Sequence, residues 1–389
     1  MLAQNIYGTS LSTLNHPNQG RTTIERIKQT EEAAFGGILA NVLTDGTSQL
    51  EIKVLEPSGK TVWSWNAKHD LKGNLPDQLH DCVSRKATTR TEAKQSEDGS
   101  LIAAIYGDAI IAVKYMPDDP ESDKRVVWGV CGDSSLLGSS HSLELLPDNL
   151  LAIATSGQSQ SDGIVIYNMS LGLSPNPTPI QRITQLPDIH ALVWEKKTQV
   201  LWAAGTNSSI DEARTATGLI NGYFYQSSSS SGQPLQQEPV SQWHIPDAIK
   251  TFTEWNNSDY HSYAKEWSAP HDLTLVPGQR TFLIATDLDI YALNMSCGRF
   301  ISGQAVVDTY LKGFSPVDHR VGNNSKGQVE ELPRSDIKSV IFGPDGITVY
   351  VQARWRTFFT NKLNFLIKGE RQQVDLQSSI YRARYFKMK

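Results

Sequence analysis

The sequence predicts an all-β fold, and three observations support this prediction. Amphipathic helical patterns are scarce in the 389 residues. Short apolar runs recur along the chain, and glycine, proline, asparagine and aspartate separate them, as in strands joined by tight turns. When these runs are aligned on the turn before each one, an internal repeat emerges, which is typical of proteins built from one repeated supersecondary unit.

The N-terminal segment does not take part in this repeat. Residues 1–35 are polar, and residues 22–35 carry the best helical pattern in the chain. They lack the basic, apolar and small-residue regions of a signal peptide. We therefore expect residues 1–35 to be an extension and residues 36–389 to form one domain without an inter-domain linker.

The first unit of the repeat covers residues 38–54, has its outer strand at 59–65, and lacks an inner strand. Five complete units follow. Each has a strand of alternating character, a turn, and a more continuously apolar second strand, followed by a third and often a fourth strand. The second strands are predicted at residues 101–106, 150–155, 200–204, 281–286 and 347–352.

The last segment, residues 379–386, is a lone predicted strand with no unit of its own. It can supply the inner strand that the first unit lacks, and this pairing removes the exposed edges of an open array. Six four-stranded units closed in this way predict a six-bladed β-propeller. The alternative is a seven-bladed ring with a degenerate blade in residues 243–267.

Composition excludes several classes of protein. The chain has 36 Lys and Arg against 41 Asp and Glu, so it has no basic surplus for binding nucleic acid. No run of 18 apolar residues is present, so we expect no membrane partner. We expect a monomer whose partner is a small molecule or a glycan.

Cysteines and glycosylation sequons favour a secreted protein. Cys82 and Cys131 precede inner strands of adjacent units at similar offsets, so a disulfide between them is geometrically reasonable and leaves Cys297 free. The low charge also fits an extracellular location. Five sequons indicate a glycoprotein, and their asparagines are Asn168, Asn207, Asn256, Asn294 and Asn323.

The repeat places polar side chains at one structural position. Six residues before each turn stand Thr91, His141, His190, His271 and Lys338. Since the first strand of a blade lines the central channel, these residues are expected to form a ring near one mouth. Period-two alternation places His141 on one face of its strand with Leu143, where a buried imidazole needs a partner.

Three interpretations of the histidines remain open. Each imidazole can bond a neighbouring backbone as a repeated packing device. The histidines can instead act as general acid and base, with Lys338 beside them. They can also bind a divalent metal such as manganese, zinc or calcium, with Gln352 or Asp272 completing the ligands.

Five further side chains are candidates for substrate binding. Arginine side chains suit the carboxylate of an acidic sugar, and an exposed tryptophan suits a sugar face. For Asp272 the favoured interpretation is a turn-capping carboxylate. The candidates are Arg334, Asp272, Arg354, Arg382 and Trp267.

Four segments carry a resemblance to a known family: HSLELLPDNLLAIATS, HALVWEKKTQVLWAAG, HDLTLVPGQRTFLIATDLDIY and the terminal YRARYF. They resemble an uncharacterised family of secreted six-bladed propellers from fungi and bacteria. The histidine layout is similar to that of propeller polysaccharide lyases, including manganese-dependent oligogalacturonate lyases, and arylsulfotransferase propellers also use channel histidines. Fungal pericyclases share the fold.

We therefore predict a secreted carbohydrate-active enzyme, most concretely a lyase acting on a uronate-containing glycan. Arg334 and Lys338 would neutralise the uronate carboxylate, one histidine would abstract the adjacent proton, and another would protonate the leaving oxygen. A non-catalytic glycan-binding propeller and a cyclase or pericyclase are the alternatives.

Overall fold

A computed structural model describes residues 36–44, 49–85, 90–132, 136–156, 162–208, 217–227, 232–246, 251–252, 270–286, 289–316, 318–323, 329–353 and 359–388. The predicted extension, residues 1–35, lies outside this part of the chain. No helix in the described ranges is long and apolar enough to cross a membrane.

Four antiparallel sheets have four strands each, in simple up-and-down order. The first sheet consists of β4 (Arg90–Gln95), β5 (Leu101–Tyr106), β6 (Ala109–Lys114) and β7 (Val126–Cys131). The second sheet consists of β8 (Ser140–Leu146), β9 (Leu150–Thr155), β10 (Ile164–Asn168) and β11 (Gln181–Ile183). The third sheet consists of β12 (Ala191–Glu195), β13 (Val200–Thr206), β14 (Gly218–Phe224) and β15 (Ser241–His244). The fourth sheet consists of β17 (Pro270–Leu275), β18 (Thr281–Thr286), β19 (Ile290–Asn294) and β20 (Arg299–Ser302).

A seven-stranded sheet joins the two ends of the described chain. Its order is β23 (Ile337–Phe342), β24 (Thr348–Gln352), β25 (Thr360–Ile367), β26 (Glu370–Phe386), β1 (Gly37–Thr44), β2 (Gln49–Leu55) and β3 (Thr61–Trp65). The first part of β26 pairs mainly with β25, and residues 378–386 pair with β1. The predicted strand at 379–386 is thus the second half of a longer strand, and it lies beside the first unit as expected.

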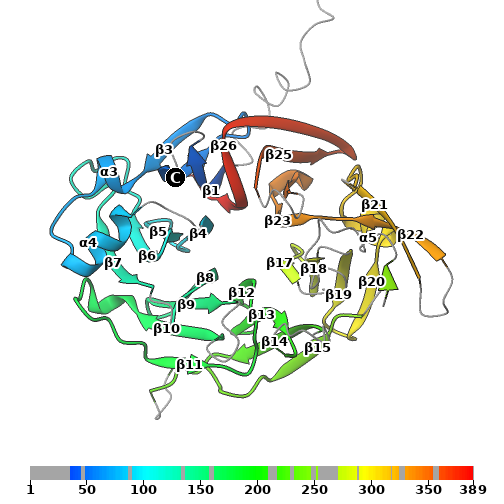
Figure 1. The fold of residues 1–389 in the computed structure, drawn as a ribbon, viewed down its shortest axis with the longest axis horizontal. Helices are drawn as coiled ribbons and strands as arrows, with labels where there is room; N and C mark the ends of the chain where they lie inside the picture. The colour runs from blue at the N-terminus through cyan, green and yellow to red at the C-terminus, as the bar shows by residue number, and fades with distance from the viewer. Residues whose placement is uncertain are drawn as a thin grey trace, which may run out of the picture.

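The sheets surround a common centre, as Figure 1 shows. Six strands lie innermost: the second half of β26, then β4, β8, β12, β17 and β23, here called the ring strands. Each ring strand contacts the next one, and β23 contacts β26. The all-β prediction with four-stranded antiparallel units is confirmed.

The second strand of each sheet is apolar because both of its faces are covered. All six residues of β9 are buried. Ala152 and Ala154 pack in one hydrophobic cluster, while Leu151 and Ile153 pack in the cluster on the opposite face. Burial on both faces explains why these strands read as continuous apolar runs, and the predicted bounds of β5, β9 and β18 match those observed.

The remaining elements lie outside these sheets. A small sheet contains β16 (Thr251–Phe252), β21 (Asp318–Asn323) and β22 (Val329–Arg334). Short helices are α3 (Ala67–Asp70), α4 (Asp77–Ser84), α5 (Gln304–Tyr310) and the 3-10 turns Met169–Leu171 and Pro344–Gly346. Within the segment proposed as a seventh blade, Trp243 belongs to β15, and residues 253–269 lie outside the described chain.

The disulfide between Cys82 and Cys131 is present, with a Cα–Cα distance of 5.8 Å, and Cys297 is free and exposed. The pairing was predicted correctly, and the two cysteines precede the ring strands β4 and β8 as expected. Cys82 lies in α4, which packs on β7, and Cys131 ends β7. The bond therefore fastens an inserted helix to the outer strand of the β4 sheet.

Candidate functional site

A β-bulge occurs at the same position in most ring strands. In β8, Ser140 pairs with Thr155 and Ser142 with Ala154, so His141 is an extra residue without a direct partner. The same break leaves one extra residue in β17, β23, β4 and β26. The residues at this bulge position are Thr91, His141, His271, Lys338 and Tyr381, and His190 stands just before β12.

The bulges explain why the repeat register found these residues and why alternation along the strand misplaces them. An extra residue interrupts the period of two and re-aims its side chain. His141 is half-buried, whereas Ser142 and Leu143 are both fully buried. The predicted shared face of His141 and Leu143 is therefore interrupted by the bulge.

Three imidazoles from three sheets meet at one end of the ring strands; we call His141, His190 and His271 the histidine cluster. The ring centroids of His141 and His190 are 4.5 Å apart, and those of His190 and His271 are 5.4 Å apart. His190 and His271 are each 4% exposed. The structure thus brings together the three histidines that the repeat singled out.

Backbone carbonyls fix the tautomers of two of these histidines. Nδ1 of His141 lies 2.7 Å from the carbonyl of Ser139, and Nδ1 of His190 lies 3.0 Å from that of Asp188. Ser139 and Asp188 have φ values of 59° and 49°, in the left-handed region that is uncommon for residues other than glycine. Because a carbonyl only accepts, Nδ1 carries the proton, and in the neutral ring Nε2 holds the lone pair.

The environment keeps His190 neutral. Burial holds the pKa of His190 well below 6.5, and the neighbouring His141, His271 and Arg382 lower this pKa further. The Asp188 carbonyl opposes the shift without overcoming it. A neutral imidazole can accept a proton or a hydrogen bond but cannot serve as a resting proton donor.

The residue after each bulge position forms a second layer: Glu92, Ser142, Ala191, Asp272, Ser339 and Arg382. In four of these, a side-chain oxygen accepts a hydrogen bond from a backbone N–H of the next ring strand. The backbone nitrogen of Leu143 lies 3.2 Å from a Glu92 oxygen, that of Leu192 lies 3.1 Å from Ser142, that of Val340 lies 2.8 Å from Asp272, and that of Ala383 lies 3.0 Å from Ser339.

Buried charges from distant parts of the chain meet in this layer. Arg384 donates to both oxygens of Asp272, at 3.1 and 2.7 Å, and to Glu92. Burial alone would raise the pKa of Glu92, but Arg384, Lys94 and Arg382 outweigh it and lower this pKa to about 2. Burial disfavours charge on Arg384 too, yet Asp272 and Glu92 raise its pKa overall.

These contacts change the interpretation of two predicted substrate-binding residues. Asp272 is 1% exposed and already bonded to Arg384 and to the Val340 N–H, so it is neither a turn cap nor directed at solvent. Arg382 has no exposed side-chain surface and donates to backbone carbonyls. Both side chains are committed to holding the ring strands together.

The other predicted site residues have different outcomes. Lys338 lies at the bulge position of β23 and is 1% exposed. Arg334 ends β22 in the separate small sheet. Arg354 and Trp267 lie outside the described residues, so their roles stay predictions.

Metal binding also stays a prediction. In the described part of the chain, no three or more His, Cys, Asp and Glu side chains are arranged to hold a metal ion. Gln352, a suggested additional ligand, donates to the carbonyl of Ser335 at 2.8 Å.

Sequence reasoning missed two residues of this centre, Glu92 and Tyr381. Glu92 follows a bulge position by one residue, so extending the repeat register along the strand could have found it. Tyr381 takes the place of the histidines on β26 and is 8% exposed. Its place depends on how β26 pairs with β1, which the repeat alone does not give.

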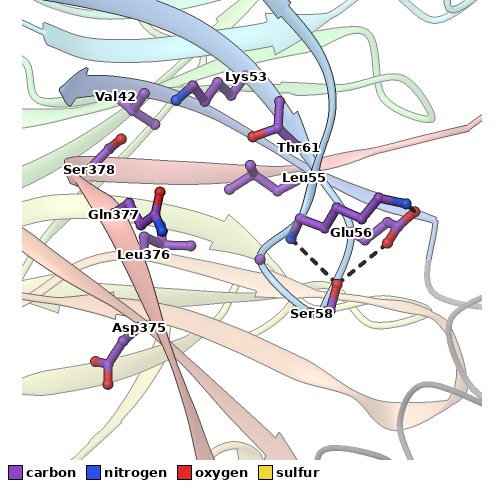
Figure 2. A pocket seen from close by; sticks show the side chains of 12 residues that line it. Val42, Lys53, Leu55, Glu56, Ser58, Thr61, Asp375, Leu376, Gln377 and Ser378 are labelled. Atoms are coloured by element: carbon purple, nitrogen blue, oxygen red, sulfur yellow. Dashed lines mark hydrogen bonds and ion pairs between the residues drawn. The ribbon is translucent and has the colours of Figure 1, made fainter.

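The far end of the ring holds a cavity of about 280 Å³. Third residues after the bulge positions of several ring strands line it, including Lys94, Glu144, Val193, Thr274 and Arg384. A larger cavity of about 580 Å³ lies between the β2–β3 turn and the middle of β26 (Figure 2). None of the predicted site residues lines this larger cavity.

Comparison with known proteins supports the architecture. No family model and no curated protein matches the chain. A structure titled a "putative 6-phosphogluconolactonase" from Bacteroides fragilis is 10% identical, with a TM-score of 0.51 over 89% of this chain and 96% of that chain. The chain has a propeller-like fold.

Two further structures are similar at lower TM-scores. One, also titled a "putative 6-phosphogluconolactonase", is from Bacteroides uniformis, with 13% identity and a TM-score of 0.48 over 89% of this chain and 98% of that chain. The other is a Trichoderma reesei carbohydrate-active enzyme of family AA12, with 13% identity and a TM-score of 0.40 over 76% of this chain and 93% of that chain.

Proposed function

We propose that the sheets are six propeller blades in a single domain, closed by β26. Support comes from the ring of contacts among the six ring strands. β4, β8, β12, β17 and β23 each begin a group of four strands, and the second half of β26 completes the group that contains β1, β2 and β3. In this arrangement β26 is the outer strand of one blade and the inner strand of the next. The histidine cluster then lies toward one mouth of the central channel.

We propose that the protein is an enzyme acting on an acidic sugar, most concretely a lyase that eliminates across the bond beside a uronate carboxylate. The observation that carries this proposal is the meeting of three imidazoles from separate sheets, with buried Lys338 at the same register position. Imidazoles next to a cation combine a base with a group that stabilises a carboxylate.

The role of each side chain in this reaction is assigned from its exposure and, for His141 and His190, from its tautomer. His141 is the most exposed of the three, and its Nε2 lone pair can take the proton from the carbon beside the carboxylate. The electron pair of that C–H bond forms the new carbon–carbon double bond, and the bond to the leaving oxygen breaks. His271 enters the step as imidazolium, gives its proton to this oxygen and is left neutral, and the proton taken by His141 is released to solvent as the product leaves. Lys338 stabilises the carboxylate charge, and neutral His190 accepts a hydrogen bond from substrate.

The test is to incubate the protein with a panel of polyuronates and follow the ultraviolet absorbance of unsaturated products. We expect product from at least one polyuronate and none from neutral glycans. His141→Gln should lower the rate by about 100-fold, as for loss of a general base. His244→Gln is the matched control, since His244 is exposed on the outer strand β15.

Two results would count against the lyase. Tight binding of polyuronates without any unsaturated product would instead favour a glycan-binding protein. Equal rates for the wild type and His141→Gln would remove the cluster from the chemistry. Buried cations beside the cluster weigh against a pericyclase, whose pocket has to be mostly apolar.

We also propose that the protein is secreted and glycosylated. The Cys82–Cys131 disulfide is compatible with an oxidising compartment. Among the sequons, Asn207 and Asn294 are exposed and Asn168 is half-buried at a strand end. Expression through a secretory pathway should give glycan-bearing peptides at Asn294, detected by mass spectrometry and absent in Asn294→Gln. An unmodified Asn294 would contradict this proposal.

A further inference from the structure

Arg382 contacts the backbone of three ring strands through its guanidinium. Its Nε donates to the carbonyl of Lys338 at 3.2 Å, and its two terminal nitrogens donate to the carbonyls of His141 at 2.7 Å and His271 at 2.5 Å. Its side chain is completely buried. One guanidinium on β26 therefore holds three other ring strands: β8, β17 and β23.

The three carbonyls belong to the residues at the bulge positions. A bulged residue lacks a direct partner in the strand ladder, so its backbone groups need hydrogen bonds from elsewhere. Arg382 supplies these bonds at once for His141, His271 and Lys338. The orientation of each peptide bond fixes the direction of the adjoining side chain, so the guanidinium sets how these three side chains converge.

The guanidinium also occupies the middle of the ring. Around the closed order of contacts, β26 is three strands away from β12, and β8 is three strands away from β23. A group on β26 that bonds both β8 and β23, which face one another, must lie near the ring axis.

We infer that Arg382 is a positioning residue for the histidine cluster, acting through the backbone of the three bulges and not through substrate. The inference rests on the proposed function only where it predicts the effect of Arg382 variants on the rate of polyuronate cleavage. It replaces the role in carboxylate binding that the sequence suggested for this arginine.

The test compares Arg382→Lys and Arg382→Gln with Arg384→Lys. Arg384 is a matched control because it is an arginine two residues away on β26 that bonds carboxylates instead of bulge carbonyls. We expect shifted imidazole NMR signals of His141 and His271 in both Arg382 variants and wild-type signals in Arg384→Lys. Loss of the nearby cation in Arg382→Gln should also raise the pKa of His190.

Kinetics provide a second readout. On a polyuronate that the wild type cleaves, Arg382→Lys should lower kcat by about 10- to 100-fold with KM nearly unchanged, since misplacement affects the reacting groups. A raised KM with unchanged kcat would instead assign Arg382 to substrate binding and overturn the inference.

The failure of the inference can be distinguished from failure of the proposed function. Unshifted imidazole signals in folded Arg382→Lys would overturn the positioning role whatever the activity. If Arg382→Lys fails to fold while Arg384→Lys folds, Arg382 serves the fold and not the cluster. If no polyuronate is cleaved, the lyase proposal fails, and the imidazole spectra still decide on Arg382.

Discussion

Replacing Glu92 with Gln is expected to lower the free energy of unfolding by about 3–5 kcal/mol. The Glu92 carboxylate is 1% exposed and accepts hydrogen bonds from Arg384, Ser142 and the Leu143 N–H. A neutral amide keeps the size of the side chain but leaves buried cationic charge without its partner. Urea denaturation followed by tryptophan fluorescence measures the change.

Glu97→Gln is the matched control for this prediction. Glu97 also forms an ion pair, with Lys196, but the side chains of both are largely exposed, at 77% and 69%. Exposed pairs contribute about 0–1 kcal/mol, so the control should unfold at nearly the same urea concentration as the wild type. Similar small losses in the two variants would show that the buried network contributes little.

Stability should fall on the acid side in two stages. Unfolded histidine takes up a proton below pH 6.5, whereas folded His190 resists it because its pKa is lowered, so stability declines as pH falls below 6.5. The pKa of Glu92 is about 2 in the folded protein against 4.5, so its contribution is present above pH 4.5. That contribution, roughly 3 kcal/mol, is lost as pH falls from 4.5 to 2.

Two variants separate these stages. His190→Gln should flatten the decline that begins at pH 6.5 and leave the steeper one below pH 4.5. Glu92→Gln should be less stable at neutral pH and should lose less stability between pH 4.5 and pH 2. The unfolding free energy of each variant, measured across this range, checks the assignment. Parallel curves for all three proteins would refute it.

Short sequence patterns predicted the strands well, because the residues that form and end a strand lie next to one another in the sequence. The second strand of a unit is apolar over its whole length and ends at turn residues, so β5 and β9 could be bounded from the sequence. The repeat register likewise found the histidine cluster, because the same position recurs in successive units.

Contacts between ring strands that are distant in sequence were not predictable in this way. Glu92 and Arg384 are 292 residues apart, and their pairing depends on which residue of β26 lies opposite Asn41 of β1. The bulges shift that register and break the alternation on which sequence interpretation relies. Arg382 therefore looked like a ligand for a substrate carboxylate, whereas it donates its hydrogen bonds to backbone carbonyls, which leave no mark in the sequence.

In the second layer, Ala191 lacks a side-chain oxygen that could bond the next ring strand, and this affects the local motions of the ring. Ala191 stands where Glu92, Ser142, Asp272 and Ser339 each give an oxygen to the next ring strand, and it has none to offer to β17. The junction between β12 and β17 is instead packed by apolar residues such as Leu273. Local opening begins where polar ties are fewest, so breathing motions of the ring should be widest there, between His190 and His271.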